Sequence, residues 1–225
     1  MPTNTTTTTM PATTTTRPVP TTTTHPPPTH VVDPSLPSLT AAFNSLTTGN
    51  LAVEVTVIRD HKKVFARASG TGPSGRAVTP ESPMVLASVS KLITATTIAR
   101  LVEAGSITLD EPVPWDSMGI AHDPAWNDVT VRELLTHTSG MPIAQKSWLN
   151  LPGSCAIPLT AALAAPPTPK RGTWVYSNGN YCALGLLIEN VTGVSRDAAA
   201  QALVFDPIGV IGPHLTTTGL LQNDG

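Results

Sequence analysis

The spacing of apolar residues changes along the first part of the chain. Leu39, Phe43 and Leu46 recur at helical spacing, which predicts a short amphipathic helix that Ser38 could cap. Residues 51–60 then alternate, with an apolar side chain at every second position. A polar turn and another apolar run follow at 64–68. This pattern predicts a helix followed by an antiparallel hairpin.

From residue 88 onward the apolar positions return to helical spacing. They predict an amphipathic helix over 88–105, which Gly105 ends. Thr130 and Glu133 form a capping-box pattern that opens another short helix. Further helices are expected at 159–164, at 181–191 with a stop at Gly193, and at 196–204. Strands followed by a run of helices, without alternation, predict the α+β class.

Composition separates the first residues from the rest of the chain. Thr and Pro make up most of residues 1–30, where Val19 is the only large aliphatic side chain. Such a segment buries too little apolar area to offset its ordering entropy. We expect residues 1–37 to be a disordered Thr/Pro-rich stalk, with one folded domain over 38–225.

Charge and composition exclude several classes of partner. A net charge of −2 without a basic stripe argues against nucleic acid. No apolar run reaches the roughly 18 residues of a membrane span, and no signal peptide is visible. A Thr/Pro stalk before a folded domain is nevertheless typical of exported, wall-associated proteins. We therefore expect an extracytoplasmic location and association with a cell wall.

The cysteines and histidines offer no metal-binding pattern. The six histidines are scattered, and neither His-x-x-x-His nor Cys-x-x-Cys occurs. There is also no Gly-rich phosphate loop, so we expect no metal, nucleotide or other cofactor. Cys155 and Cys182 could form a disulfide that stabilises the fold by about 3–4 kcal/mol, or could remain two buried thiols. The sequence leaves both open.

Ser88 and Lys91 are the first candidates for catalysis. At the start of a helix, residues three apart lie on one face, with Cβ atoms about 5–6 Å apart. A serine needs a neighbouring base to become a nucleophile, and a lysine with a lowered pKa can supply one. Free backbone N–H groups at the helix start could stabilise an oxyanion. Taken alone, the pair is also compatible with a capping serine and a surface lysine.

Tyr176 and Asn178 form a second candidate motif. Tyrosine is scarce in this chain, and Tyr176 lies in a Tyr-x-Asn sequence just before an apolar helix. A tyrosine beside a cationic lysine can act as a general base, and Asn178 could hold a substrate amide. Taken alone, the motif is also compatible with an ordinary turn before a helix.

Around these motifs the chain resembles the serine β-lactamase-like superfamily, in particular class C β-lactamases, D-Ala-D-Ala carboxypeptidases and related esterases. The resemblance covers about residues 38–215. It rests on LASVSK at 86–91, LVEAG at 101–105, LDEPV at 109–113, VRELLTHTSG at 131–140, and the stretch from YSN at 176–178 to residue 193.

The resemblance implies a role for each candidate residue. Ser88 would be the acylated nucleophile and Lys91 its proton partner. Tyr176 would be the base that also activates the deacylating water, and Asn178 would contact the substrate's amide carbonyl. His137 would lie beneath the site, where a structural role in a helix-ending turn is favoured over catalysis.

One element of the family pattern is missing from the chain. The family carries Lys-Thr-Gly or His-x-Gly on a strand far downstream of the tyrosine. The Lys-x-Gly of this chain, at 170–172, precedes Tyr176. We therefore expect an incomplete, C-terminally truncated domain, of whose sheet only the N-terminal hairpin is present.

These observations predict a serine hydrolase that works through an acyl-enzyme. Its substrate would be a small molecule or a cell-wall peptide: a β-lactam, a D-Ala-D-Ala peptide or a small ester. The alternative is a truncated, non-catalytic wall-associated binding module or an inactive gene product.

Overall fold

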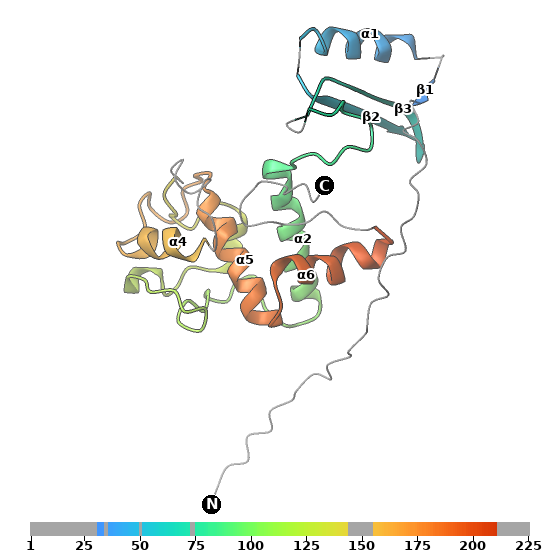
Figure 1. Ribbon diagram of the computed structural model, residues 1–225. Helices are drawn as coiled ribbons and strands as arrows, with labels where there is room; N and C mark the ends of the chain where they lie inside the picture. Colours follow the sequence, from blue (N-terminus) through green and yellow to red (C-terminus); the bar gives the residue numbers. More distant parts are fainter. Residues whose placement is uncertain (1–30, 34–35, 50, 73–74, 144–154, 211–225) are drawn as a thin grey trace, which may run out of the picture. The chain divides into compact units, whose positions relative to one another are not determined.

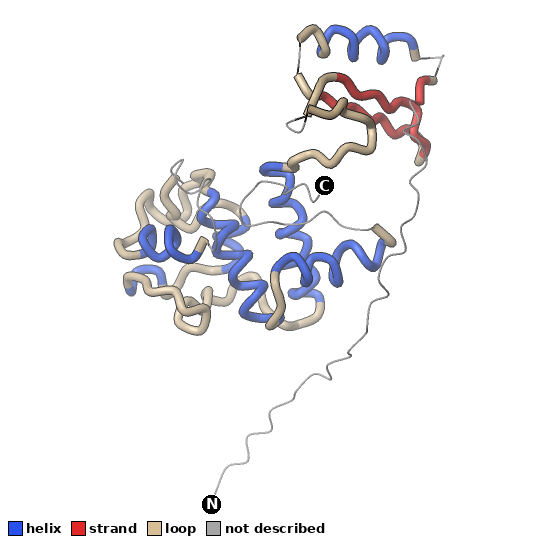
Figure 2. The backbone as a smooth tube through the Cα atoms, viewed as in Figure 1, coloured by secondary structure: helices blue, strands red, loops and turns tan. Residues whose placement is uncertain are grey.

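The computed structural model describes residues 31–210 except 34–35, 50, 73–74 and 144–154 (Figure 1). The chain divides into two compact units, one ending at Ser82 and the other beginning at Pro83. Among the described residues, the strands lie in the first unit and most helices in the second (Figure 2). The α+β class is confirmed. The stalk predicted for residues 1–37 lies mostly outside the described residues.

The first unit is a three-stranded antiparallel sheet covered by one helix. Its strands are β1 (Val31–Val32), β2 (Val53–Arg59) and β3 (Lys62–Ser69), in the order β1-β3-β2. Asp60 and His61 both have positive φ, as a two-residue hairpin turn requires. The predicted hairpin is confirmed.

Helix α1 (Pro37–Leu46) belongs to the same unit as the sheet. The ring centroids of buried Phe43 and Phe65 lie 5.9 Å apart, and the Arg67 guanidinium stands 4.9 Å from the Phe43 ring centroid. These contacts pack Phe43, the buried residue of α1, against β3, whereas Leu46 is exposed.

Two details of this unit differ from the prediction. The sheet begins at β1, inside the segment assigned to the stalk, because Val31 and Val32 pair with Ala66 and Phe65. Two residues are too few to show a strand period, so only the pairing partner reveals them. The prediction that Ser38 caps the helix was also wrong. The helix begins at Pro37, whose missing N–H and fixed φ reduce the need for a capping side chain.

The second unit consists of helices joined by long loops. A 3₁₀ turn (Ala87–Val89) leads into α2 (Ser90–Glu103). The other helices are α3 (Val131–Leu135), α4 (Ala156–Leu163), α5 (Asn178–Thr192) and α6 (Arg196–Ala200), the last continued by a π-helical turn (Gln201–Phe205). Single 3₁₀ turns lie at Pro124–Trp126 and Asp206–Ile208. None of the described helices is both long and apolar enough to cross a membrane.

Local sequence signals explain where these helices begin and end. The capping box at α3 is present in both directions, with Thr130 and Glu133 each accepting from the other's backbone N–H. Gly193 ends α5 with φ 69°, a left-handed conformation that glycine adopts at little cost. Helix α5 starts earlier than predicted because Ser177 caps it, accepting from the Gly179 N–H at 3.1 Å. Asn178 therefore belongs to its first turn.

Helix α5 is the centre of the second unit. It contacts α2, α3, α4 and α6, and eight of its residues are buried. Trp115 and Trp126 pack edge to face, with ring centroids 6.5 Å apart, and each indole N–H donates to a backbone carbonyl. The loops around α5 are thus part of the core.

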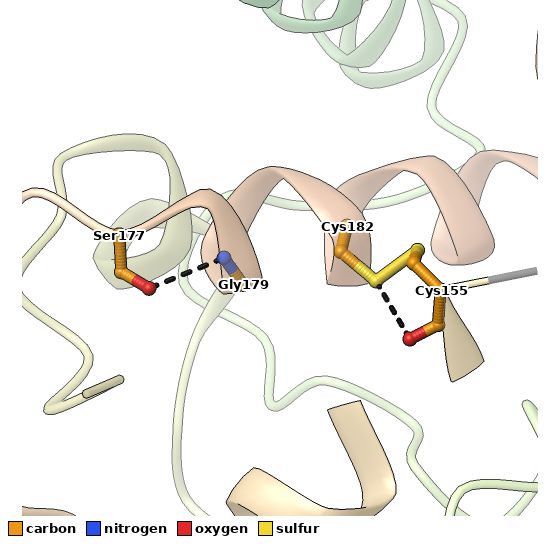
Figure 3. The surroundings of a disulfide bond; sticks show 4 residues. All are labelled: Cys155, Ser177, Gly179 and Cys182. Atoms are coloured by element: carbon orange, nitrogen blue, oxygen red, sulfur yellow. Dashed lines mark hydrogen bonds between the residues drawn. A yellow bond between two sulfur atoms is a disulfide. The ribbon is translucent and has the colours of Figure 1, made fainter. Parts of the chain in front are cut away.

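A disulfide joins Cys155 to Cys182, which settles the alternative that the sequence left open (Figure 3). It links the start of α4 to α5, on the helix that Ser177 caps. It closes a loop with a sequence separation of 27 residues.

Candidate active site

Ser88 and Lys91 occupy the start of the α2 segment, as predicted. Ser88 is the middle residue of the 3₁₀ turn, and Lys91 lies in the first turn of α2. Ala87, directly before Ser88, has φ 46°, a conformation that costs a non-glycine residue about 1–2 kcal/mol. Backbone strain of this kind is concentrated at functional sites. The Ser88 side chain is exposed.

Tyr176 comes from the other side of the site, just before α5. Its hydroxyl oxygen lies 2.7 Å from Ser88 Oγ, within hydrogen-bond distance. Lys91 Nζ donates to Ser88 Oγ at 3.3 Å and stands 5.0 Å from the centroid of the Tyr176 ring. The three predicted catalytic side chains therefore meet at one point.

Asn178 holds the lysine in place. Its Oδ1 accepts a hydrogen bond from Lys91 Nζ at 2.7 Å, which is shorter than the 3.3 Å bond from the same nitrogen to Ser88 Oγ. The Tyr181 ring centroid lies 5.6 Å from the same nitrogen. An ammonium between two aromatic rings and an amide oxygen is oriented toward Ser88 with little freedom to turn away.

The charge of Lys91 changes the chemistry of Tyr176. Hydrogen bonding to Lys91, and then to Ser88, lowers the pKa of the Tyr176 phenol from its ordinary value of 10.0. Burial, followed by the charge on Tyr176, raises the pKa of Tyr181. Of the two tyrosines, Tyr176 is thus the one that forms a tyrosinate more readily. This is the property a general base next to a serine needs.

The sequence pointed to His137 but missed the residues around it. Its ring centroid lies 4.7 Å from that of Tyr176 and 5.2 Å from that of Tyr181. Its Nδ1 is 3.0 Å from the Nδ2 of Asn180, a fully buried residue of α5. The polar pair Asn178 and Asn180, just before the mainly apolar stretch 181–188 of α5, was the available signal.

An ion pair fixes the loop that leads to Tyr176. Arg171 donates to both carboxylate oxygens of Glu133, at 3.1 and 2.7 Å, and to the Asp128 carbonyl at 2.7 Å. Burial alone would raise the pKa of Glu133, but hydrogen bonds from Arg171 and the Thr130 backbone bring it below its usual value. The capping box of α3 therefore also anchors the loop before the site.

No group of three potential ligands capable of holding a metal ion occurs within the part of the chain that the structure describes. The site consists of a hydroxyl, an ammonium, a phenol and an amide. These groups can take part in proton transfer and nucleophilic attack.

A helix start bearing Ser88 and Lys91, facing a Tyr-x-Asn turn, defines the serine β-lactamase and penicillin-binding class. The chain belongs to the beta-lactamase family, whose sequence model matches residues 39–221. The resemblance inferred from the sequence is confirmed.

Relatives of known name share this segment. Esterase EstB of Burkholderia gladioli is 32% identical over 181 residues, which cover 69% of this chain and 45% of EstB. Penicillin-binding protein 4 of Amycolatopsis lactamdurans is 31% identical over 141 residues, 61% of this chain and 37% of that protein. The solved octameric penicillin-binding protein homologue of Pyrococcus abyssi is 28% identical, with a TM-score of 0.60 over 78% of this chain and 42% of its own. The chain spans less than half the length of each relative.

Proposed function

We propose that this protein is a serine hydrolase that cleaves an amide or ester through an acyl-enzyme. The observation that carries the proposal is the meeting of Ser88, Lys91 and Tyr176, with Ser88 Oγ 2.7 Å from the phenol oxygen. A packed structural serine would not need a phenol of lowered pKa beside it.

In the acylation step, deprotonated Tyr176 takes the hydroxyl proton of Ser88 while Oγ attacks the carbonyl carbon. The resulting tetrahedral oxyanion needs a hydrogen-bond donor. The N–H groups of Val89 and Ser90 already donate to Leu86 and Ala87 carbonyls, which leaves the N–H of Ser88 itself for this task. Tyr176 then passes its proton to the leaving nitrogen or oxygen as the scissile bond breaks.

Deacylation reverses the same proton path. Tyr176 takes a proton from a water molecule, which attacks the acyl carbon, and Ser88 regains its proton as it leaves. Lys91 donates a hydrogen bond to Ser88 and stabilises the tyrosinate. Because Asn178 Oδ1 is occupied by Lys91, its Nδ2 is the group that donates to a substrate carbonyl.

The substrate we propose is a β-lactam, a D-Ala-D-Ala peptide or a small ester. The names of two relatives, an esterase and a penicillin-binding protein, support an ester or a penicillin as acyl donor. These substrates share a carbonyl that a serine can attack, so the site is compatible with each.

We also propose an extracytoplasmic location with association to a cell wall. Disulfides persist mainly in oxidising compartments, and the Cys155–Cys182 bond fits such a setting. The Thr/Pro-rich composition of residues 1–30, before β1, fits a stalk that tethers the enzyme.

The test is turnover of a penicillin, a D-Ala-D-Ala peptide and an activated ester by the full chain, compared with its Ser88→Ala variant. We expect hydrolysis of at least one substrate by the wild-type protein and none by the variant. Binding of a penicillin or peptide without turnover, equal in both proteins, would instead support the alternative of a non-catalytic binding module.

A further inference from the structure

The residues on both sides of Tyr176 are hydrogen-bonded to one residue, His137. The Val175 N–H donates to the His137 carbonyl at 2.9 Å. The Ser177 N–H donates to the His137 ring at Nδ1, at 3.3 Å. The His137 ring also packs against the Tyr176 ring. Tyr176 is therefore held by His137 through the preceding residue, the following residue and its own side chain.

The protonation of the His137 ring follows from its partners. A backbone N–H can only donate, so Nδ1 must accept the bond from Ser177. The Met141 N–H donates to Ser139 Oγ at 3.1 Å, and Ser139 Oγ donates to Asn180 Oδ1 at 2.6 Å. The Asn180 amide is thereby oriented with its NH₂ toward Nδ1. Both routes leave Nδ1 unprotonated.

The neighbouring charges favour the same state. Burial, and then the Lys91 ammonium, lower the pKa of His137. The two donors aimed at Nδ1 belong to Ser177 and Asn180, which are both buried, so each would be costly to leave without an acceptor.

We propose that His137 is the positioning residue for Tyr176, holding the phenol against Ser88 through an unprotonated Nδ1 that buried Asn180 and Ser139 fix in place. This proposal rests on the proposed function because it assumes that Tyr176 is the general base. It predicts that the acceptor at Nδ1, and not merely an aromatic ring at this position, is needed.

Two variants separate the acceptor from the ring. His137→Asn keeps an acceptor near the position of Nδ1, and Asn tolerates the φ of 60° found here. His137→Phe keeps an aromatic ring but offers no acceptor to Ser177 and Asn180. Both are compared in a Tyr181→Phe background, in which Tyr176 is the remaining tyrosine of the chain's two.

The first readout is the absorbance titration of the Tyr176 phenol, and the second is the rate of acylation by an activated ester. In His137→Phe we expect the titration midpoint to move up toward about 10. We expect acylation to slow by about 10²-fold, as a displaced catalytic group does. His137→Asn should restore both to near the parent values. Equal behaviour of the two variants, or a parent-like His137→Phe, would overturn the proposal.

These readouts keep the two proposals distinguishable. If the parent protein is not acylated, the hydrolase function is contradicted. If the titration midpoint of Tyr176 still rises in His137→Phe, the positioning role is supported all the same. Should His137→Phe fail to fold, ring-nitrogen NMR of the full chain decides. The positioning role requires a bare Nδ1 and a protonated Nε2 at neutral pH, and a protonated Nδ1 would contradict it.

Discussion

At the scale of single residues, Lys91 has two roles in the proposed mechanism. It donates to Ser88 and Asn178, and its charge makes the Tyr176 phenol easier to deprotonate. A cation that stays protonated suits the second role, because a tyrosinate needs a fixed positive charge beside it. In the proposed mechanism the base is thus Tyr176, and the lysine makes it effective.

This account predicts a particular pH dependence. Tyr176 is an acid with a lowered pKa, so tyrosinate, and with it acylation, should increase with pH through a midpoint below 10.0. In Lys91→Met the phenol loses the hydrogen bond to Lys91, and with it the charge, that lower its pKa, so the absorbance midpoint should move up toward 10.0. An unchanged midpoint in Lys91→Met would contradict the role assigned to the lysine.

The two tyrosines provide a matched pair for the role of the base. Tyr176→Phe removes the phenol next to Ser88 and should slow acylation by about 10²–10⁴-fold, the usual contribution of a general base. Tyr181→Phe removes a hydroxyl that donates to the Leu135 carbonyl and keeps the ring, so its effect should be much smaller. Stopped-flow acylation by an activated ester measures both. Equal losses would argue against Tyr176 as the base.

The sequence could identify the four proposed site residues but not the residues that hold them. Ser88 and Lys91 lie three residues apart, and Tyr176 and Asn178 lie two apart at the start of α5, so each pair is visible as a short motif. His137 and Asn180 are 43 positions apart, and Ser139 and Asn180 are 41 apart. Only tertiary structure brings such residues together.

At the scale of elements, the segment around His137 lies alongside the segment that leads to Tyr176. Gly172 N–H donates to the Thr138 carbonyl at 2.8 Å, and Val175 N–H to that of His137. Gly140 lies at the end of this contact and has φ 82°. A Cβ at this position would lie 2.6 Å from Pro167 Cβ and 2.7 Å from the Pro169 carbonyl oxygen, so the close packing requires glycine.

Gly140→Ala should therefore destabilise the second unit and slow acylation by displacing the Tyr176 segment. Its matched control is Gly193→Ala, where φ is 69° but nothing lies within 4 Å of the added Cβ. The free energy of unfolding of the control should fall by about 1–2 kcal/mol from backbone strain alone. That of Gly140→Ala should fall by more. Denaturant unfolding compares them, and a Gly140→Ala loss no greater than that of the control would contradict the close packing.

Element boundaries were predictable wherever a local signal decided them. The capping box at Thr130 and the left-handed Gly193 appear where the sequence places them. The start of α5 was misplaced because Ser177 as a cap is hard to distinguish from a turn serine. Strand β1 was missed because its pairing with β3 has no local signature.

At the scale of the whole molecule, the second unit contains all the candidate catalytic residues, and a disulfide reinforces it. The Cys155–Cys182 bond ties α4 to α5, the helix whose first turn holds Asn178. Removing this cross-link should act mainly on the entropy of the unfolded chain.

We expect the Cys155→Ala/Cys182→Ala double variant to lose about 3–4 kcal/mol of unfolding free energy, the chain-entropy value for a loop of this size. Denaturant unfolding of the oxidised wild type, the reduced wild type and the double variant measures this. The two proteins without the bond should agree closely. A wild type that is insensitive to reduction would contradict a structural role for the disulfide.

The central claim is that Ser88 is an activated nucleophile, and intact mass spectrometry tests it most directly. The full chain is incubated with a penicillin and, separately, with an activated ester, and Ser88→Ala is treated in the same way. The account predicts a mass increase by one acyl group in the wild type alone, located on the peptide that contains Ser88. A folded wild type without any adduct, or an adduct that persists in Ser88→Ala, would contradict it.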